Sequence, residues 1–77
     1  MRTVHMIGRM RLVVGGREHG IPHFHIKIPG GGDCAVSIAT LEILAGRALP
    51  RTIQPALDWA RKNKEKLLRI WQEMNPR

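Results

Sequence analysis

Apolar and polar residues alternate along most of the first half of the chain, which is the two-residue period of a half-buried β-strand. The alternation covers residues 3–14, where Gly8 marks a bend or bulge, and then residues 23–28 and 33–38. Turn-forming residues, rich in glycine and proline, separate these stretches. A short apolar segment at 41–45 predicts one more strand. The pattern therefore predicts an antiparallel meander of three to four strands.

The last third of the chain changes to the spacing of an amphipathic helix. Apolar residues recur every three or four positions from about residue 52 to 74, and Thr52 is a suitable N-cap. In an unbroken helix Lys64 would lie within the apolar stripe, and Asn63 before it is a good N-cap for a second helix. One kinked helix and two shorter helices both fit, and we favour one helix kinked near Asn63. The chain is thus predicted to be a single α+β domain, residues 1–77, with a C-terminal helix covering one face of the sheet.

The phases of the strands assign side chains to the two faces of the predicted sheet. The inward set consists of Val4, Met6, Met10, Leu12, Val14, Phe24, Ile26, Ile28, Cys34, Val36 and Ile38. The outward set consists of His5, Arg9, Arg11, His23, His25, Lys27, Ser37 and Glu42. The outward set is basic and rich in histidine, so we expect the uncovered face to be the working surface.

Charge and composition narrow the classes of partner. The chain of 77 residues carries a net charge of +7, and the basic excess is spread over both halves. A basic domain attracts phosphate backbones and acidic proteins, so RNA and an acidic cognate protein are the expected partners. The single cysteine, Cys34, fits a reducing cytoplasm, and no apolar run approaches the roughly 20 residues of a membrane span. An uncovered edge strand would also allow a homodimer.

The histidine-rich segment "REHGIPHFHIKI", residues 17–28, is suited to RNA cleavage without a metal or other cofactor. Such a reaction needs a base, an acid and cations around the phosphate, and histidine fits both proton-transfer roles. His23 and His25 project on the same side of a strand and are the candidate proton donor and acceptor, with His5 completing the set. The candidate phosphate contacts are Arg9, Arg11, Arg17 and Lys27.

Two other hypotheses remain open. The first is a metal site formed by His19, His23 and His25, to which Glu18 or Asp33 would add an oxygen ligand. The second is a non-catalytic domain, similar to a transcriptional regulator, that binds nucleic acid or protein through its basic face. Cys34 is predicted to be buried and without a catalytic role.

Three segments carry a resemblance to a small bacterial family, domain of unknown function 4160. "EHGIPHFHI" resembles the family's Asp-His-x-Pro-Pro-His-Phe-His signature, while "TLEILAG" and "DWARKNKEKLLRIW" resemble its central and C-terminal segments. Relatives are often encoded beside a second small domain in what look like toxin–antitoxin pairs, which implies a related role here. The positions that match the family pattern are His19, Pro22, His23, Phe24, His25 and Glu42, with Trp59 and Trp71 as structural positions. Ile21 and Glu18 depart from the signature's proline and aspartate, and the first strand lacks the aromatic residues of relatives.

Overall fold

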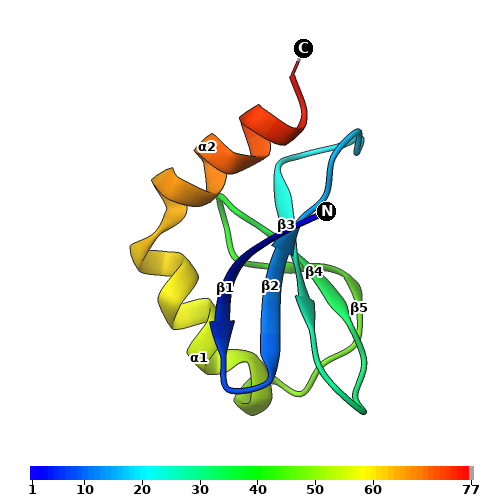
Figure 1. The fold of residues 1–77 in the computed structure, drawn as a ribbon. Helices are drawn as coiled ribbons and strands as arrows, with labels where there is room; N and C mark the ends of the chain where they lie inside the picture. Colours follow the sequence, from blue (N-terminus) through cyan, green and yellow to red (C-terminus); the bar gives the residue numbers. More distant parts are fainter. Residues whose placement is uncertain (77) are drawn as a thin grey trace.

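The computed structural model describes residues 1–76, and within them it contains five strands and two helices (Figure 1). The strands are β1 (Arg2–Ile7), β2 (Met10–Val14), β3 (His23–Lys27), β4 (Cys34–Ser37) and β5 (Ile43–Gly46). They form one antiparallel sheet in chain order, β1-β2-β3-β4-β5. The helices are α1 (Pro50–Lys62) and α2 (Lys64–Met74). The α+β class is confirmed, and the strand count of three to four is wrong because residues 3–14 form a hairpin of two strands.

The β1–β2 hairpin also corrects the predicted face of several side chains. Gly8 has a positive φ of 57° in a two-residue turn, a conformation that glycine adopts without a steric cost. A bulge between Thr3 and His5 inserts one residue into β1 and reverses the phase of the rest of that strand. As a result His5 pairs with the core residue Leu12, whereas Met6, predicted to be buried, is 52% exposed.

The helical region is divided rather than kinked, so the single helix we favoured is wrong. The first helix begins at Pro50, where a missing N–H costs nothing, and its N-cap is Leu49 rather than Thr52. At the break, Asn63 donates a hydrogen bond from Nδ2 to the carbonyl oxygen of Trp59 (2.8 Å). Lys64 then reaches away from the apolar stripe and donates to the carbonyl oxygen of Ala39 (2.6 Å). The break therefore spares the Lys64 ammonium group the burial that a continuous helix would impose.

The core lies between the sheet and the two helices. The buried members of this core are Leu12, Val14, Phe24, Ile26, Cys34, Val36, Ile38, Ile53, Ala56, Ala60, Leu67, Ile70 and Trp71. They come from alternate strand positions and from one side of each helix, as the period of each element requires. Within residues 1–76, no helix has both the length and the apolar character that crossing a membrane requires.

The sheet face opposite the helices is partly covered. Val13 projects from this face beside its pairing partner His25, yet it is only 1% exposed. The loop of residues 15–22 folds back toward this face, because Glu18 reaches His25. The end of the sheet at which β3 begins is therefore a half-buried site, while Arg11 at the other end is exposed.

Candidate functional site

Basic side chains from neighbouring elements meet at the exposed end of the sheet. Arg11 on β2 pairs with Lys27 on β3, so both side chains project from the face opposite the helices. Arg9 lies in the β1–β2 turn rather than on a strand, and it joins them at an open depression of about 470 Å³. The depression, here called the cationic depression, is lined by Met1, Arg9, Arg11, Lys27, Ile28, Pro29 and Asp33. Asp33 accepts a hydrogen bond from Lys27 Nζ (3.2 Å), so this carboxylate balances part of the positive charge of the cationic depression.

Farther along the same face, one carboxylate joins two histidines. Glu18 Oε2 lies 2.5 Å from His23 Nε2, and Glu18 Oε1 lies 3.1 Å from His25 Nε2. We call these three residues the Glu18 cluster. Their side chains are half-buried, with exposed fractions of 26% for Glu18, 14% for His23 and 23% for His25. The histidine rings meet edge to face, with their centroids 5.2 Å apart.

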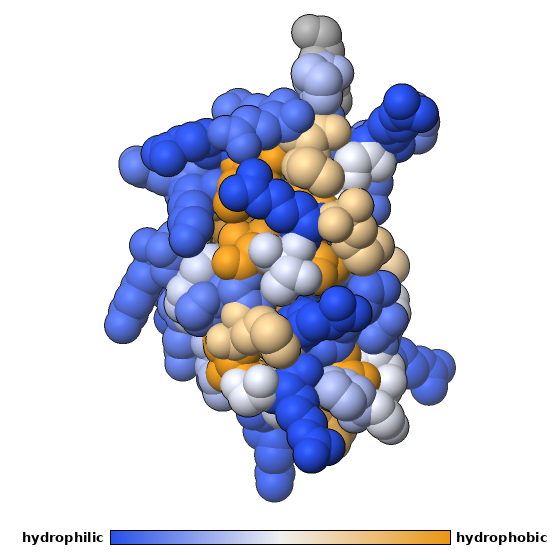
Figure 2. All heavy atoms as spheres, in the orientation of Figure 1, coloured by the Kyte–Doolittle hydropathy of each residue, from blue (hydrophilic) through white to orange (hydrophobic). Residues whose placement is uncertain are grey.

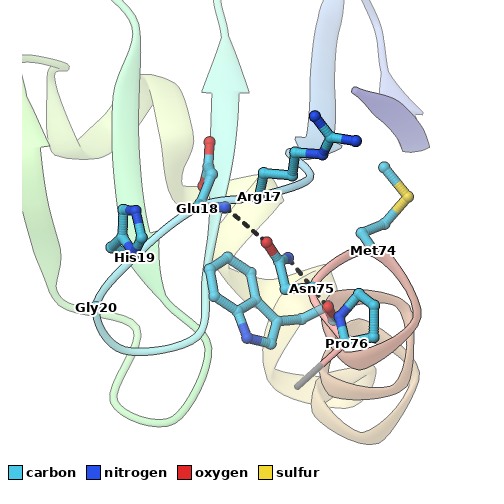
Figure 3. Close-up of a pocket in the computed structure, with 8 residues that line it drawn as sticks. Arg17, Glu18, His19, Gly20, Met74, Asn75 and Pro76 are labelled. Carbon is cyan, nitrogen blue, oxygen red and sulfur yellow. Dashed lines mark hydrogen bonds between the residues drawn. The ribbon is translucent and has the colours of Figure 1, made fainter.

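The C-terminal end of α2 holds the loop that carries Glu18. Asn75 accepts a hydrogen bond from the Glu18 N–H through Oδ1 (2.7 Å) and donates from Nδ2 to the Gly15 carbonyl oxygen (2.9 Å). Figure 3 shows Asn75 beside the loop, with the Glu18 side chain pointing away from it. At Gly15, a side-chain carbon would overlap the Glu18 carboxylate, so the carboxylate uses the space that this glycine leaves open. Loop and helix together enclose an open depression lined by Arg17, Glu18, His19, Gly20, Trp71, Met74, Asn75 and Pro76.

The structure separates several residues that the sequence pattern grouped. His5 projects toward the helices and stacks on Trp59, with ring centroids 4.3 Å apart, so it lies on the opposite face of the sheet from His25. His19 is exposed on the loop and is not a member of the Glu18 cluster. Arg17 lines the loop depression instead of the cationic depression.

The remaining motif positions have structural contacts. Phe24 is fully buried in the core, and the Pro22 carbonyl oxygen accepts a hydrogen bond from the Ile38 N–H (3.1 Å). Glu42 lies in the turn before β5 rather than on a strand, and its carbonyl oxygen accepts from the Ser37 N–H (2.9 Å). Burial, and to a smaller degree the charge of Asp33, raises the pKa of the Cys34 thiol, which keeps this side chain a neutral part of the core.

Sequence reasoning missed the residues that connect the loop to α2. Asn75 comes after the last helical residue and resembles an ordinary C-cap, while its contacts with Gly15 and Glu18 span about sixty positions of the chain. Trp71 was expected to be a structural position and is buried in the core, and it also contacts the ring of His23, with centroids 4.8 Å apart. No local pattern signals such contacts, because they depend on where α2 ends relative to the sheet.

Figure 2 shows the outer surface on the side viewed in Figure 1, where hydrophilic side chains predominate and smaller apolar areas lie among them. Large exposed apolar side chains, including Ile21, Leu44 and Leu49, come from different segments, and Ile21 lies with Leu68 in one small apolar depression. A few exposed apolar side chains are ordinary for a folded domain and do not by themselves mark a binding site.

Comparison with known proteins identifies the family. Neither the curated proteins nor the solved structures contain a match to the chain. A family model described as "Domain of unknown function (DUF4160)" matches residues 9–72. This match covers β2 to α1 and most of α2, and it includes Glu18 and the three basic residues of the cationic depression, so the chain belongs to the DUF4160 family.

Proposed function

We propose that this protein binds RNA, and that the cationic depression holds the phosphate backbone. The observation that carries the proposal is that Arg9, Arg11 and Lys27, from a turn and two strands, line one depression. Two cations paired directly across strands repel one another, and a bound phosphate relieves that repulsion. The net charge of +7 adds a long-range attraction for polyanions.

The test is fluorescence anisotropy with a labelled single-stranded RNA over a range of salt concentrations. Each phosphate contact with a single strand contributes about −0.7 to the slope of log K against log salt concentration, where K is the association constant. Three contacts therefore predict a slope of about −2. Replacing Arg11 with alanine (Arg11→Ala) should reduce the steepness of that slope by about 0.7 and weaken binding.

Lys62→Ala is the matched control, because it removes the same charge from the exposed surface of α1. Equal losses in both variants would show that only net charge matters and would refute the cationic depression as the binding site. A third outcome concerns an acidic polypeptide such as poly-glutamate. If it binds, competes with RNA and no longer binds to Arg11→Ala, an acidic protein is favoured as the natural occupant of this face.

A second candidate function is cleavage of the bound RNA in the cytoplasm, as the toxin-like component of a pair whose acidic partner covers this face. It is favoured by His25, which lies two residues from Lys27 on the same face of β3. His25 would take the proton of the 2′-hydroxyl while O2′ bonds to phosphorus. His23 would give a proton to the departing O5′, leaving a 2′,3′-cyclic phosphate and a 5′-hydroxyl.

This candidate predicts that cleavage of labelled RNA persists in EDTA and is abolished in a folded His25→Ala variant, whereas His5→Ala retains it. Expression in a bacterial host should then arrest growth only when His25 is intact. Full cleavage by His25→Ala, or cleavage that EDTA abolishes, would exclude metal-free catalysis by this cluster.

A further inference from the structure

The Glu18 cluster has the composition and arrangement of a metal-binding site. One atom from each of Glu18, His23 and His25 can be chosen so that all three lie within 4.8 Å of one another. Two imidazole nitrogens and a carboxylate oxygen are the donors that first-row transition metals take in open, three-ligand sites. The distances and contacts of each ligand therefore decide whether the cluster fits an ion.

Glu18 lies close enough to both histidines for the three side chains to share one ion. Donor atoms that each lie about 2.1 Å from a metal are about 3.0–3.4 Å from one another in octahedral or tetrahedral sites. Glu18 Oε1 is already 3.1 Å from His25 Nε2, and Oε2 is in direct contact with His23 Nε2. A divalent ion among these atoms would replace the two histidine–carboxylate contacts with metal–ligand bonds.

The orientation of His23 is fixed in the way that metal-binding histidines usually are. Its Nδ1 lies 2.8 Å from the carbonyl oxygen of Ile21, which can only accept, so Nδ1 carries a hydrogen. The Nε2 lone pair is then the one available to a ligand, and it faces Glu18. A backbone carbonyl on the far nitrogen is a recurrent partner of histidines that bind metals, because it sets the tautomer and the ring direction.

Access and rigidity also suit a bound ion. All three side chains keep part of their surface exposed, so water can reach the cluster. The loop is held by Asn75 through the Glu18 N–H, and His23 rests against the Trp71 ring. The ligands are thus placed by strand, loop and helix together before an ion arrives.

We propose that Glu18, His23 and His25 bind one divalent first-row transition-metal ion, for which Zn²⁺ is the first probe. This site does not depend on RNA binding, because its ligands are separate from the lining of the cationic depression. It replaces the sequence-based set of His19, His23 and His25, with the carboxylate of Glu18 in the place of His19. It is an alternative to metal-free cleavage by the same histidines, because a bound ion would occupy both Nε2 atoms, and the EDTA arm of the cleavage assay distinguishes the two.

The experiment is calorimetric titration of Zn²⁺ into the untagged protein after treatment with a chelator. One ion should bind per chain, and His25→Ala and Glu18→Gln should each weaken binding at least about 100-fold. His19→Ala and His5→Ala are the matched controls, since each removes an imidazole that lies outside the cluster, and their affinity should stay within about threefold of the wild type. Circular dichroism checks that each variant is folded.

The result that overturns the proposal is a wild-type protein that shows no saturable binding at equimolar Zn²⁺. An equal loss in His19→Ala and His25→Ala would also overturn it, because that would indicate adventitious binding by surface histidines. If the variants do not fold, titration of the wild type with Co²⁺ decides: visible absorption bands that saturate at one ion per chain support the site, and their absence refutes it. Failure of RNA binding in the anisotropy assay would leave these outcomes unaffected.

Discussion

Asn75 is the residue whose removal tests most directly how the fold supports the Glu18 cluster. Its side chain bonds two backbone groups of the loop, the Glu18 N–H and the Gly15 carbonyl oxygen, at 2.7 and 2.9 Å. Nδ2 also contacts the Trp71 carbonyl oxygen (3.0 Å), but that oxygen keeps the Asn75 backbone N–H as a donor (2.8 Å) in any variant. The change Asn75→Ala therefore deprives two part-buried loop groups of their partners.

The expected cost can be worked out from those two bonds. A hydrogen bond in a folded protein contributes about 0.5–1.5 kcal/mol net, so Asn75→Ala should lower the free energy of unfolding by about 1–3 kcal/mol. A domain of this size has a total stability of about 4–12 kcal/mol, so the loss is a substantial share. At about 4–8 °C per kcal/mol, a loss of about 2 kcal/mol would lower Tm by about 8–16 °C.

The assay is urea denaturation monitored by circular dichroism, with Gln72→Ala as the control because Gln72 is exposed on the same helix. The control should change the unfolding free energy by less than about 0.5 kcal/mol. Hydrogen exchange at the Glu18 amide should also accelerate in Asn75→Ala. The reasoning is refuted if Asn75→Ala unfolds with the same free energy as Gln72→Ala, or if the Glu18 amide stays protected.

Further predictions concern the sheet and its core. Gly46→Ala should destabilise the protein far more than Gly30→Ala. Both glycines have a positive φ, 84° at Gly46 and 70° at Gly30. A side-chain carbon at Gly46 would overlap the Asp33 carbonyl oxygen, whereas at Gly30 it would meet open space. Urea denaturation should show a loss of about 1–2 kcal/mol for Gly30→Ala and a clearly larger loss for Gly46→Ala, and equal losses would contradict the close approach of Gly46 to the Asp33 backbone. His5→Ala should cost about 0.5–1.5 kcal/mol through loss of the Trp59 stack, should shift tryptophan emission, and should leave RNA affinity unchanged. Because the pKa of Cys34 is raised by burial, the folded thiol keeps its proton after the unfolded thiol ionises near pH 9.0, so the wild type should lose stability as pH rises through that value. The loss should be absent from the pH profile of Cys34→Ala, and parallel profiles would argue against a buried neutral thiol.

The parts of the fold that the sequence predicted well are those in which burial alone sets the pattern. In β3 the alternation placed Phe24 and Ile26 inward and His25 outward, and the structure agrees, because this strand has a covered face and no irregularity. The same reasoning failed in β1, where the bulge before His5 adds one residue and shifts the phase. Nothing in the local sequence distinguishes a bulge at that position from a regular strand.

The candidate site was predicted in part for a similar reason. His23 and His25 share a strand, so the period-two rule was enough to place them together, and the phases of neighbouring strands did the same for Arg11 and Lys27. Glu18 and His19 share a loop, and the sequence alone could not decide which of them turns toward β3. That choice depends on Asn75 and on the space above Gly15, which are properties of the assembled tertiary structure.

The order of the strands in the sheet has a consequence for how the molecule folds. Each strand pairs with its neighbour in the chain, so the sheet can grow by successive short loop closures, which is the kind of topology that folds quickly. The bonds from Asn75 to Gly15 and Glu18 are of the opposite kind, because they join the end of the described chain to the first third of it. We expect the sheet to form first and α2 to dock afterwards, so the Glu18 cluster is completed in the last step of folding. In a nascent chain that lacks α2, His23 and His25 would be present, but the loop that carries Glu18 would not yet be held in place.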